Sequence, residues 1–179
     1  MGAELIEIIN NLLISSRYSV DGNSMSPALK HGDQVLAARV KRQYRRGDVV
    51  VFQRQVRSRG VDIKRIIGLP EEEIFLGDDG VLINGAVLLE QYLPGGSNLI
   101  HADREYHPPR ETDRFWITGP GEFFVMGDQR ENSQDSRSFG PVTENRMLGR
   151  VWLRYWPLRA WNTISTSGQT SDNNHPYTR

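Results

Sequence analysis

The sequence contains no cysteine, no excess of charge of either sign and no long apolar run. Without cysteine, a disulfide framework, a Cys-ligated zinc or iron–sulfur site and a thiol nucleophile are all excluded. Because 22 basic residues balance 22 acidic ones, the strongly basic face of a nucleic-acid-binding protein is not expected. No segment reaches the roughly 18 to 20 apolar residues of a spanning helix, and the N-terminal residues do not resemble a signal peptide. The chain as given is therefore expected to be soluble.

The 179 residues suffice for one domain that buries a core without disulfides or a structural metal. Helical spacing of leucine and isoleucine predicts an amphipathic helix over about residues 3–14, in an N-terminal segment of residues 1–16. After it, short β-type runs broken by Gly, Pro and Asp predict an all-β, mainly antiparallel fold. The expected strands cover residues 34–40, 48–53, 61–67, 80–83, 115–118, 123–126 and 149–155.

The domain is expected to span residues 1–161. Turn residues are dense between residues 71 and 118, which predicts a small insertion there. Residues 162–179 are polar and lack the apolar side chains that order a segment, so they are expected to form a disordered tail.

No metal and no cofactor is expected. The histidines have none of the spacings found in metal sites: His31, His101, His107 and His175. Residues 128–135 are acidic and amide-rich like a calcium loop, but Arg130 occupies a ligand position and the central Gly is missing.

A serine and a lysine are the first candidates for chemistry. Ser24 lies in a Gly-containing turn that leaves room for a substrate carbonyl, but its hydroxyl needs a base, and no histidine has a triad context. Lys64 lies in a predicted strand whose alternation turns it to the same face as Ile66. Burial among apolar groups would lower the pKa of its amine, so Lys64 is a candidate base. Seen alone, the segment favours an ordinary solvated lysine.

The segment 126–142 strengthens the catalytic interpretation. Two hydroxyls, two carboxylates and a guanidinium in one short loop exceed what an ordinary loop needs, but they suit a buried polar network. Ser133 is a candidate to orient the Lys64 amine. Asp135 and Arg137 are candidates for an ion pair that braces the loop without charging the lysine directly.

Together these segments resemble the type I signal peptidase family, membrane-bound serine proteases that remove signal peptides with a Ser–Lys dyad. The resemblance covers most of residues 18–157. It rests on four motifs in the family's order: Ser24-Met25-Ser26-Pro27, Arg46-Gly47-Asp48, Lys64-Arg65-Ile66-Ile67-Gly68-Leu69-Pro70, and a box from Gly127 to Gly140. It implies a complex β fold of the signal-peptidase and SOS-repressor type, with a small inserted β subdomain. It also implies the site residues, which are the nucleophile Ser24, the general base Lys64, the lysine-orienting Ser133 and the supporting pair of Asp135 and Arg137.

The resemblance further implies the substrate. The family cleaves extended peptides after small side chains at the −1 and −3 positions, so signal peptides of secreted preproteins are the expected partners. The residues that match the lining of those pockets are Val20, Met25, Leu29 and Ile63, although plain core packing would explain each of them. The Ser24 N–H is the expected oxyanion donor, and Gly22 stands where some members place a second, hydroxyl donor.

Several alternatives remain open. The family normally has a spanning helix before the Ser-Met motif and acts at the extracytoplasmic face of the cell membrane. This chain is either a form without its anchor or a soluble relative with another substrate. Aromatic residues near the C-terminal end suggest a peripheral membrane contact or ordinary packing: Trp152, Tyr155, Trp156 and Trp161. The rival functions are a self-cleaving Ser–Lys regulator and a non-catalytic β binding module.

Overall fold

The computed structural model describes residues 11–39, 43–54, 60–77, 80–93 and 114–164, together with the backbone of residues 169–170. Strands dominate these residues, and every pairing among them is antiparallel. The helical elements named in this part of the chain are short: α2 (Ser136–Phe139), η1 (Glu144–Arg146) and η2 (Leu158–Ala160). The predicted all-β, mainly antiparallel fold is thereby confirmed.

Eight strands of the described part of the chain form the larger sheet. In spatial order they are β1 (Ser15–Ser19), β2 (Gln34–Ala38), β11 (Met147–Trp156), β3 (Val49–Gln53), β4 (Val61–Gly68), β9 (Glu122–Met126) and β10 (Val142–Thr143), and β12 (Asn162–Thr163) also pairs with β11. The first four residues of β3, Val-Val-Val-Phe, are all buried, as expected of β-branched and aromatic residues in a central strand.

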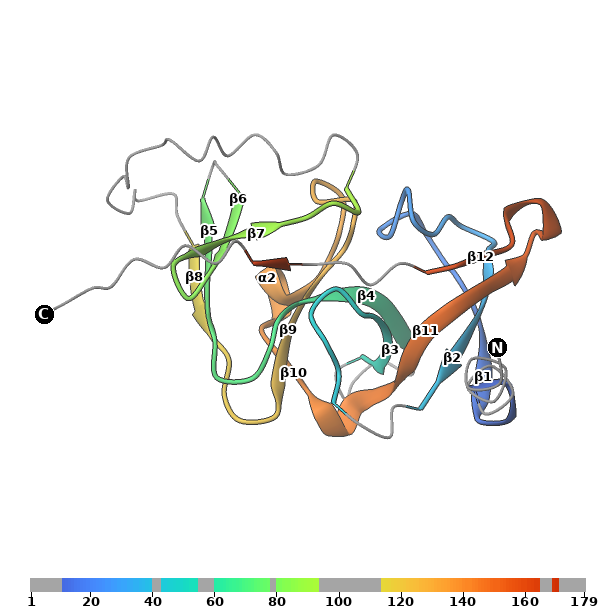
Figure 1. Ribbon diagram of the computed structural model, residues 1–179, viewed down its shortest axis with the longest axis horizontal. Coiled ribbons are helices and arrows are strands. Elements are labelled where there is room, and N and C mark those ends of the chain that lie inside the picture. The colour runs from blue at the N-terminus through green and yellow to red at the C-terminus, as the bar shows by residue number, and fades with distance from the viewer. Residues whose placement is uncertain are drawn as a thin grey trace, which may run out of the picture.

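The smaller sheet contains five strands of the described residues, in the order β13 (Gln169–Thr170), β7 (Ala86–Leu89), β6 (Gly80–Ile83), β5 (Glu73–Gly77) and β8 (Arg114–Ile117). A two-residue turn joins β6 to β7 at Asn84 and Gly85, whose φ angles are 51° and 78°. Two positive φ angles are what a type I′ hairpin requires. Strands β5 to β8 lie in the stretch that the sequence predicts as an insertion. Figure 1 shows them to one side of the molecule, with β4 and β9 between them and the strands β1, β2 and β11.

Strand β4 separates two apolar clusters of the core. Ile63 belongs to a cluster that includes Val20, Met25 and Leu29. Ile66 belongs to a second cluster, which includes Phe52. Successive side chains of a strand point to opposite faces, so Lys64 faces the side of Ile66 as predicted. The next element of the chain, β5, begins the smaller sheet, whose own core lies around Ile74 and Phe124.

The two ends of the described chain differ from the sequence-based expectations. Residues 3–10 of the predicted helix lie outside the described residues, and of the rest residues 11–13 are helical. The polar segment Ser15–Ser19 is strand β1, which was not predicted. Two short strands, β12 and β13, fall within the stretch predicted as a disordered tail. Backbone hydrogen bonds hold such strands and need no apolar side chains. Among the described residues, no helix has the length and apolarity needed to cross a membrane.

Candidate active site

The turn between β1 and β2 presents Ser24 at the edge of the larger sheet. Two neighbours of Ser24, Met25 and Leu29, are fully buried and anchor the turn in the core. The Leu29 N–H donates to the Met25 carbonyl at 2.8 Å, and the Ser26 N–H donates to the Asn23 carbonyl at 2.9 Å. Because these backbone bonds fix the turn, the position of the Ser24 hydroxyl is determined by the fold.

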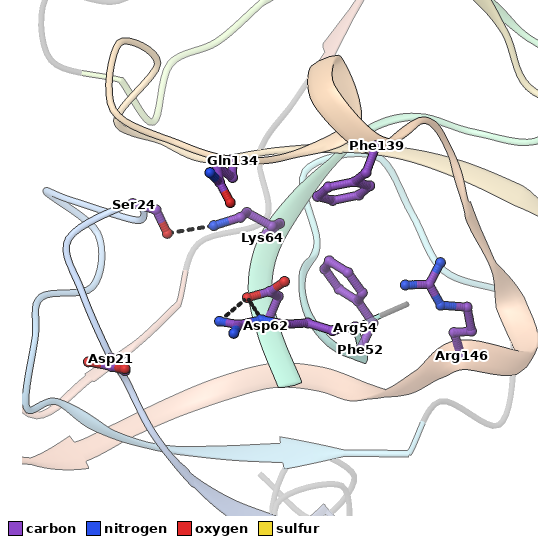
Figure 2. A pocket seen from close by; sticks show the side chains of 9 residues that line it. All are labelled: Asp21, Ser24, Phe52, Arg54, Asp62, Lys64, Gln134, Phe139 and Arg146. Atoms are coloured by element: carbon purple, nitrogen blue, oxygen red, sulfur yellow. Dashed lines mark hydrogen bonds and ion pairs between the residues drawn. The ribbon is translucent and has the colours of Figure 1, made fainter. Parts of the chain in front are cut away.

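Lys64 reaches Ser24 from strand β4. Its Nζ donates a hydrogen bond to Ser24 Oγ at 2.6 Å, and only 4% of the residue is exposed. Figure 2 shows the two side chains pointing toward one another across the end of a cleft. The structure thus brings together two residues that lie 40 positions apart in the sequence.

Burial is the main reason why the pKa of the Lys64 amine lies below its ordinary value. Two carboxylates nearby, Asp62 and Asp135, act to raise this pKa, and Arg54 and Arg137 act to lower it. Each carboxylate has its own arginine partner. Arg54 Nε donates to Asp62 at 2.8 Å, and Arg137 Nε donates to Asp135 at 2.8 Å. The arginines offset the carboxylate charges, so desolvation of the amine prevails.

The loop after β9 carries the other predicted residues. Asp135 caps helix α2 and accepts hydrogen bonds from the Arg137 guanidinium, at 2.8 Å to each carboxylate oxygen, and from the Gly127 N–H at 2.9 Å. Burial would raise the pKa of the Asp135 carboxyl, but these hydrogen bonds outweigh burial, and the pKa lies below its ordinary value. The pair therefore holds the loop that contains Ser133.

Ser133 lies close to both Ser24 and Gly127. Its Oγ is buried and makes no hydrogen bond of normal geometry among the described residues, although it lies near enough to the Asp135 carboxylate to help lower the pKa of that group; a direct bond to Lys64 is absent in this structure. A Cβ atom placed on Gly127 would lie 2.3 Å from Ser133 Oγ and 2.5 Å from the Ser24 carbonyl oxygen. Gly127 is therefore the point at which the loop, Ser133 and the Ser24 turn meet.

The residues predicted to line substrate pockets lie together in one place. Val20, Met25, Leu29 and Ile63 belong to one apolar cluster, and all four are buried. A cleft of about 460 Å³ opens on the opposite face of β4, where it is lined by Ser24, Lys64 and seven other residues: Asp21, Phe52, Arg54, Asp62, Gln134, Phe139 and Arg146. Figure 2 shows the Arg54–Asp62 ion pair below Lys64 and the rings of Phe52 and Phe139 beside it.

Sequence reasoning missed several charged residues around the site. Arg65, the neighbour of Lys64, forms a buried ion pair with Asp128, with N–O distances of 2.8 and 2.7 Å. Both residues could have been found from their positions in the sequence, because Arg65 follows Lys64 and Asp128 follows Gly127, the first glycine of the loop motif. Arg54 gave no such signal. Gly22 stands at the position where some family members have a second oxyanion donor. Its φ is 80°, and its N–H donates to His31 Nδ1 at 3.1 Å.

No group of three or more potential metal ligands is gathered anywhere in the described residues. The arrangement is instead one for acid–base chemistry between an amine and a hydroxyl. A mainly antiparallel β fold that buries a lysine amine against a serine hydroxyl suits a serine peptidase.

Comparisons with known proteins agree with this class. The family described as signal peptidase, peptidase S26, matches residues 2–156. Signal peptidase IB of Staphylococcus aureus is 32% identical over 167 residues, which cover 87% of this chain and 85% of that protein. Signal peptidase I of Bacillus caldolyticus is 36% identical over 160 residues, which cover 83% of this chain and 83% of that protein. The family match and these relatives show that the chain belongs to the signal peptidase family and is a peptidase.

A solved structure is also similar. The crystal structure of a signal peptidase I from Enterococcus faecalis V583 is 31% identical in sequence, covers 61% of this chain and 97% of that chain, and gives a TM-score of 0.47.

Proposed function

We propose that this protein is a serine endopeptidase that removes signal peptides from secreted preproteins, with Ser24 as nucleophile and Lys64 as general base. The observation that carries the proposal is the 2.6 Å contact between Lys64 Nζ and Ser24 Oγ. It joins an amine whose pKa is lowered by burial to the hydroxyl that it must activate. Family membership supports the same reaction.

The reaction starts from the neutral amine. Lys64 Nζ takes the proton of the Ser24 hydroxyl while Oγ attacks the carbonyl carbon of the scissile bond. The resulting oxyanion is stabilised by the Ser24 N–H. Lys64 then gives its proton to the leaving amide nitrogen, and the acyl-enzyme remains. A water molecule loses a proton to Lys64 and attacks the ester carbonyl, and Lys64 returns that proton to Ser24 Oγ as the C–O bond breaks and the carboxylic acid product leaves.

The loop residues act on the dyad without taking part in bond changes. Asp135 and Arg137 neutralise one another and hold the loop against Gly127. Ser133 Oγ, which makes no hydrogen bond of normal geometry in the described chain, is available to accept a hydrogen bond from the Lys64 amine once substrate is bound. This bond would aim the lone pair of the neutral amine at Ser24.

The substrate is an extended peptide that adds a strand beside Lys64. Strand β3 pairs with β4 from Val61 to Arg65, whereas β9 pairs with β4 only from Arg65 onward within the described residues. The backbone from Val61 to Lys64 is therefore open on the side of β9 to strand addition. Family resemblance makes Val20, Met25, Leu29 and Ile63 our candidates for the recognition of small side chains at −1 and −3. They are buried on the face of β4 opposite the cleft, so an added strand would approach them with the alternate side chains that point to that face.

Cleavage of a synthetic precursor with an Ala-x-Ala site, followed by mass spectrometry, tests the proposal. Ser24→Ala and Lys64→Ala are each expected to lower kcat by at least about 1,000-fold without unfolding the protein. Ser26→Ala, a serine of the same turn, and Lys30→Ala, an exposed lysine, are the matched controls. Full activity of either dyad variant would refute the assignment. Cleavage of the protein's own chain without activity on added peptide would instead indicate a self-cleaving regulator.

We further propose a peripheral contact with the membrane surface around η2. Three large apolar side chains there are exposed: Trp156 at 52%, Leu158 at 65% and Trp161 at 60%. Trp152 differs, because its indole N–H donates to Ser15 Oγ at 2.9 Å. Interfacial tryptophans favour the headgroup region of a bilayer.

Flotation with lipid vesicles tests this contact. Trp156→Ala combined with Trp161→Ala should abolish association, whereas Phe115→Ala, which removes an exposed aromatic of β8, should not. Equal flotation of the double variant and the unaltered protein would refute the contact.

A further inference from the structure

A buried charged cluster lies between the smaller sheet and the loop that carries Ser133. Glu90 follows strand β7 and is 2% exposed. Its carboxylate forms an ion pair with Arg130 of that loop, in which Arg130 Nη1 donates to Oε2 at 2.8 Å and Nη2 donates to Oε1. The Tyr92 hydroxyl also donates to Glu90 Oε1, at 2.5 Å. A residue of the smaller sheet thus holds an arginine of the proposed catalytic loop.

The cluster reaches the reacting groups through the backbone of the loop. Arg130 Nε donates to the Gly127 carbonyl at 3.2 Å, and Gly127 is the residue packed against the Ser24 carbonyl and Ser133. Two residues after Gly127, the Gln129 N–H donates to the Ser24 carbonyl at 3.0 Å. Two residues, Arg130 and Gly127, therefore connect Glu90 to the turn that presents Ser24.

A second contact reaches the strand of Lys64. The Arg65 guanidinium lies over the Tyr92 ring, 4.0 Å from its centroid, and it also pairs with Asp128. Arg65 follows Lys64 in β4, and Asp128 follows Gly127 in the loop. Tyr92 thus lies between the charge cluster and the two segments that meet at the dyad.

We infer that Glu90, through its ion pair with Arg130, is a positioning residue that fixes the Gly127 segment against Ser24. The inference rests on the proposed function of Ser24 and Lys64. A segment that bonds to the Ser24 carbonyl and packs on Ser133 sets the direction of both hydroxyls relative to the lysine amine. Displacement of reacting groups by even a fraction of an ångström lowers the chemical rate while leaving distant substrate contacts intact.

The experiment compares Glu90→Gln with Glu72→Gln in the cleavage assay. The control pair is closely matched, because Glu72 lies just before β5 of the smaller sheet, as Glu90 lies just after β7, and forms a two-pronged ion pair with Arg46, at 2.6 and 2.9 Å. In the described residues, the further side-chain hydrogen bonds of this pair go to Ile67 and Leu69, outside the loop. Glu90→Gln is expected to lower kcat about tenfold with KM within about twofold of the original, whereas Glu72→Gln keeps kcat. A purely structural role predicts similar losses of melting temperature in both variants and unchanged kcat in both, and that result would overturn the inference.

A double-mutant cycle sharpens the test. Because Glu90 acts through Arg130, Glu90→Gln combined with Arg130→Gln should lower kcat no further than the worse single variant. If the two single-variant losses of kcat multiply in the double variant, the inference is overturned. If Glu90→Gln does not fold, Tyr92→Phe serves in its place, since it keeps the ring on Arg65 and removes only the bond to Glu90. It should lower kcat about threefold, and unchanged kcat would overturn the inference.

Failure of the inference is distinguishable from failure of the proposed function. If Ser24→Ala is inactive and Glu90→Gln keeps the original kcat, only the positioning role is wrong. If Ser24→Ala remains active, the dyad assignment is wrong and the positioning role falls with it.

Discussion

Substitution of Gly127 by alanine tests whether the loop after β9 is packed on the Ser24 turn as tightly as the structure indicates. The new Cβ would lie 2.5 Å from the Ser24 carbonyl oxygen and 2.6 Å from Ser133 Cβ. Rotation about χ1 can move Ser133 Oγ away, but it can move neither Ser133 Cβ nor the Ser24 carbonyl, so the backbones of the two segments must shift.

The size of the effect follows from these distances. Ordinary contact begins at 3.4 Å, so the two segments must separate by about 1 Å, and misplacement of that size lowers the rate of a positioned reaction about 100-fold. Overpacking of this kind costs about 1 to 3 kcal/mol of unfolding free energy. For a chain of this length, the melting temperature should fall by about 2 to 12 °C.

The assay is peptide cleavage at a temperature well below the melting transition, with unfolding followed in parallel by circular dichroism. Gly60→Ala is the control, because its nearest neighbour would be the Arg54 side chain at 3.7 Å, an ordinary contact. Full activity of Gly127→Ala with an unchanged melting temperature would refute the packing of the loop on the Ser24 turn.

Three further substitutions probe the charges and hydroxyls of the site. Because burial lowers the pKa of Lys64, the unfolded chain binds more protons than the folded one up to about pH 10.5. Lys64→Met should therefore be more stable than the original protein to urea at pH 7, with the gain shrinking as the pH rises toward 10.5; an equal gain at both pH values would contradict this reasoning. Ser133→Ala removes a buried hydroxyl that makes no hydrogen bond of normal geometry in the described chain and interacts only loosely with Asp135, so its melting temperature should change by less than about 2 °C while kcat falls about tenfold; a large loss of stability would show that the hydroxyl is strongly bonded. The pKa of Asp135 is lowered in the folded state, so Asp135→Asn should lose about 1 to 3 kcal/mol at pH 7, and the loss should begin to shrink as the pH falls below the unfolded value of 3.8 and vanish only below the lower folded pKa; a loss that does not change with pH over this range would exclude the charge as its cause.

The parts of the fold that follow from local sequence were predictable. β-Branched runs located β3 and β4, and alternation along β4 correctly turned Lys64 toward Ile66. Turn residues were dense in the stretch that contains Asn84 and Gly85, and the structure has a hairpin at these two residues with the required positive φ angles. These features depend on neighbouring residues only, so one sequence carries enough information to find them.

Features that depend on distant partners were not predictable. Strand β1 has the sequence Ser-Ser-Arg-Tyr-Ser, which lacks an alternating apolar pattern and is held by pairing with β2. The ion pair of Glu90 with Arg130 joins residues 40 positions apart, and neither side chain stands out locally. The Ser24–Lys64 contact spans the same separation. It was anticipated because the chemistry of a serine nucleophile requires a base, and because the motifs resembled those of a family.

The most direct test of the account is an NMR titration of the Lys64 side chain, labelled at Cε and Nζ. The sequence has three lysines, Lys30, Lys41 and Lys64, so the Lys64→Arg variant identifies the signal by its disappearance. The account predicts that this amine loses its proton at a pH below the 10.5 of an ordinary lysine, and that the same transition governs the acid limb of kcat/KM. Titration of Lys64 at or above 10.5 in the folded protein would contradict it.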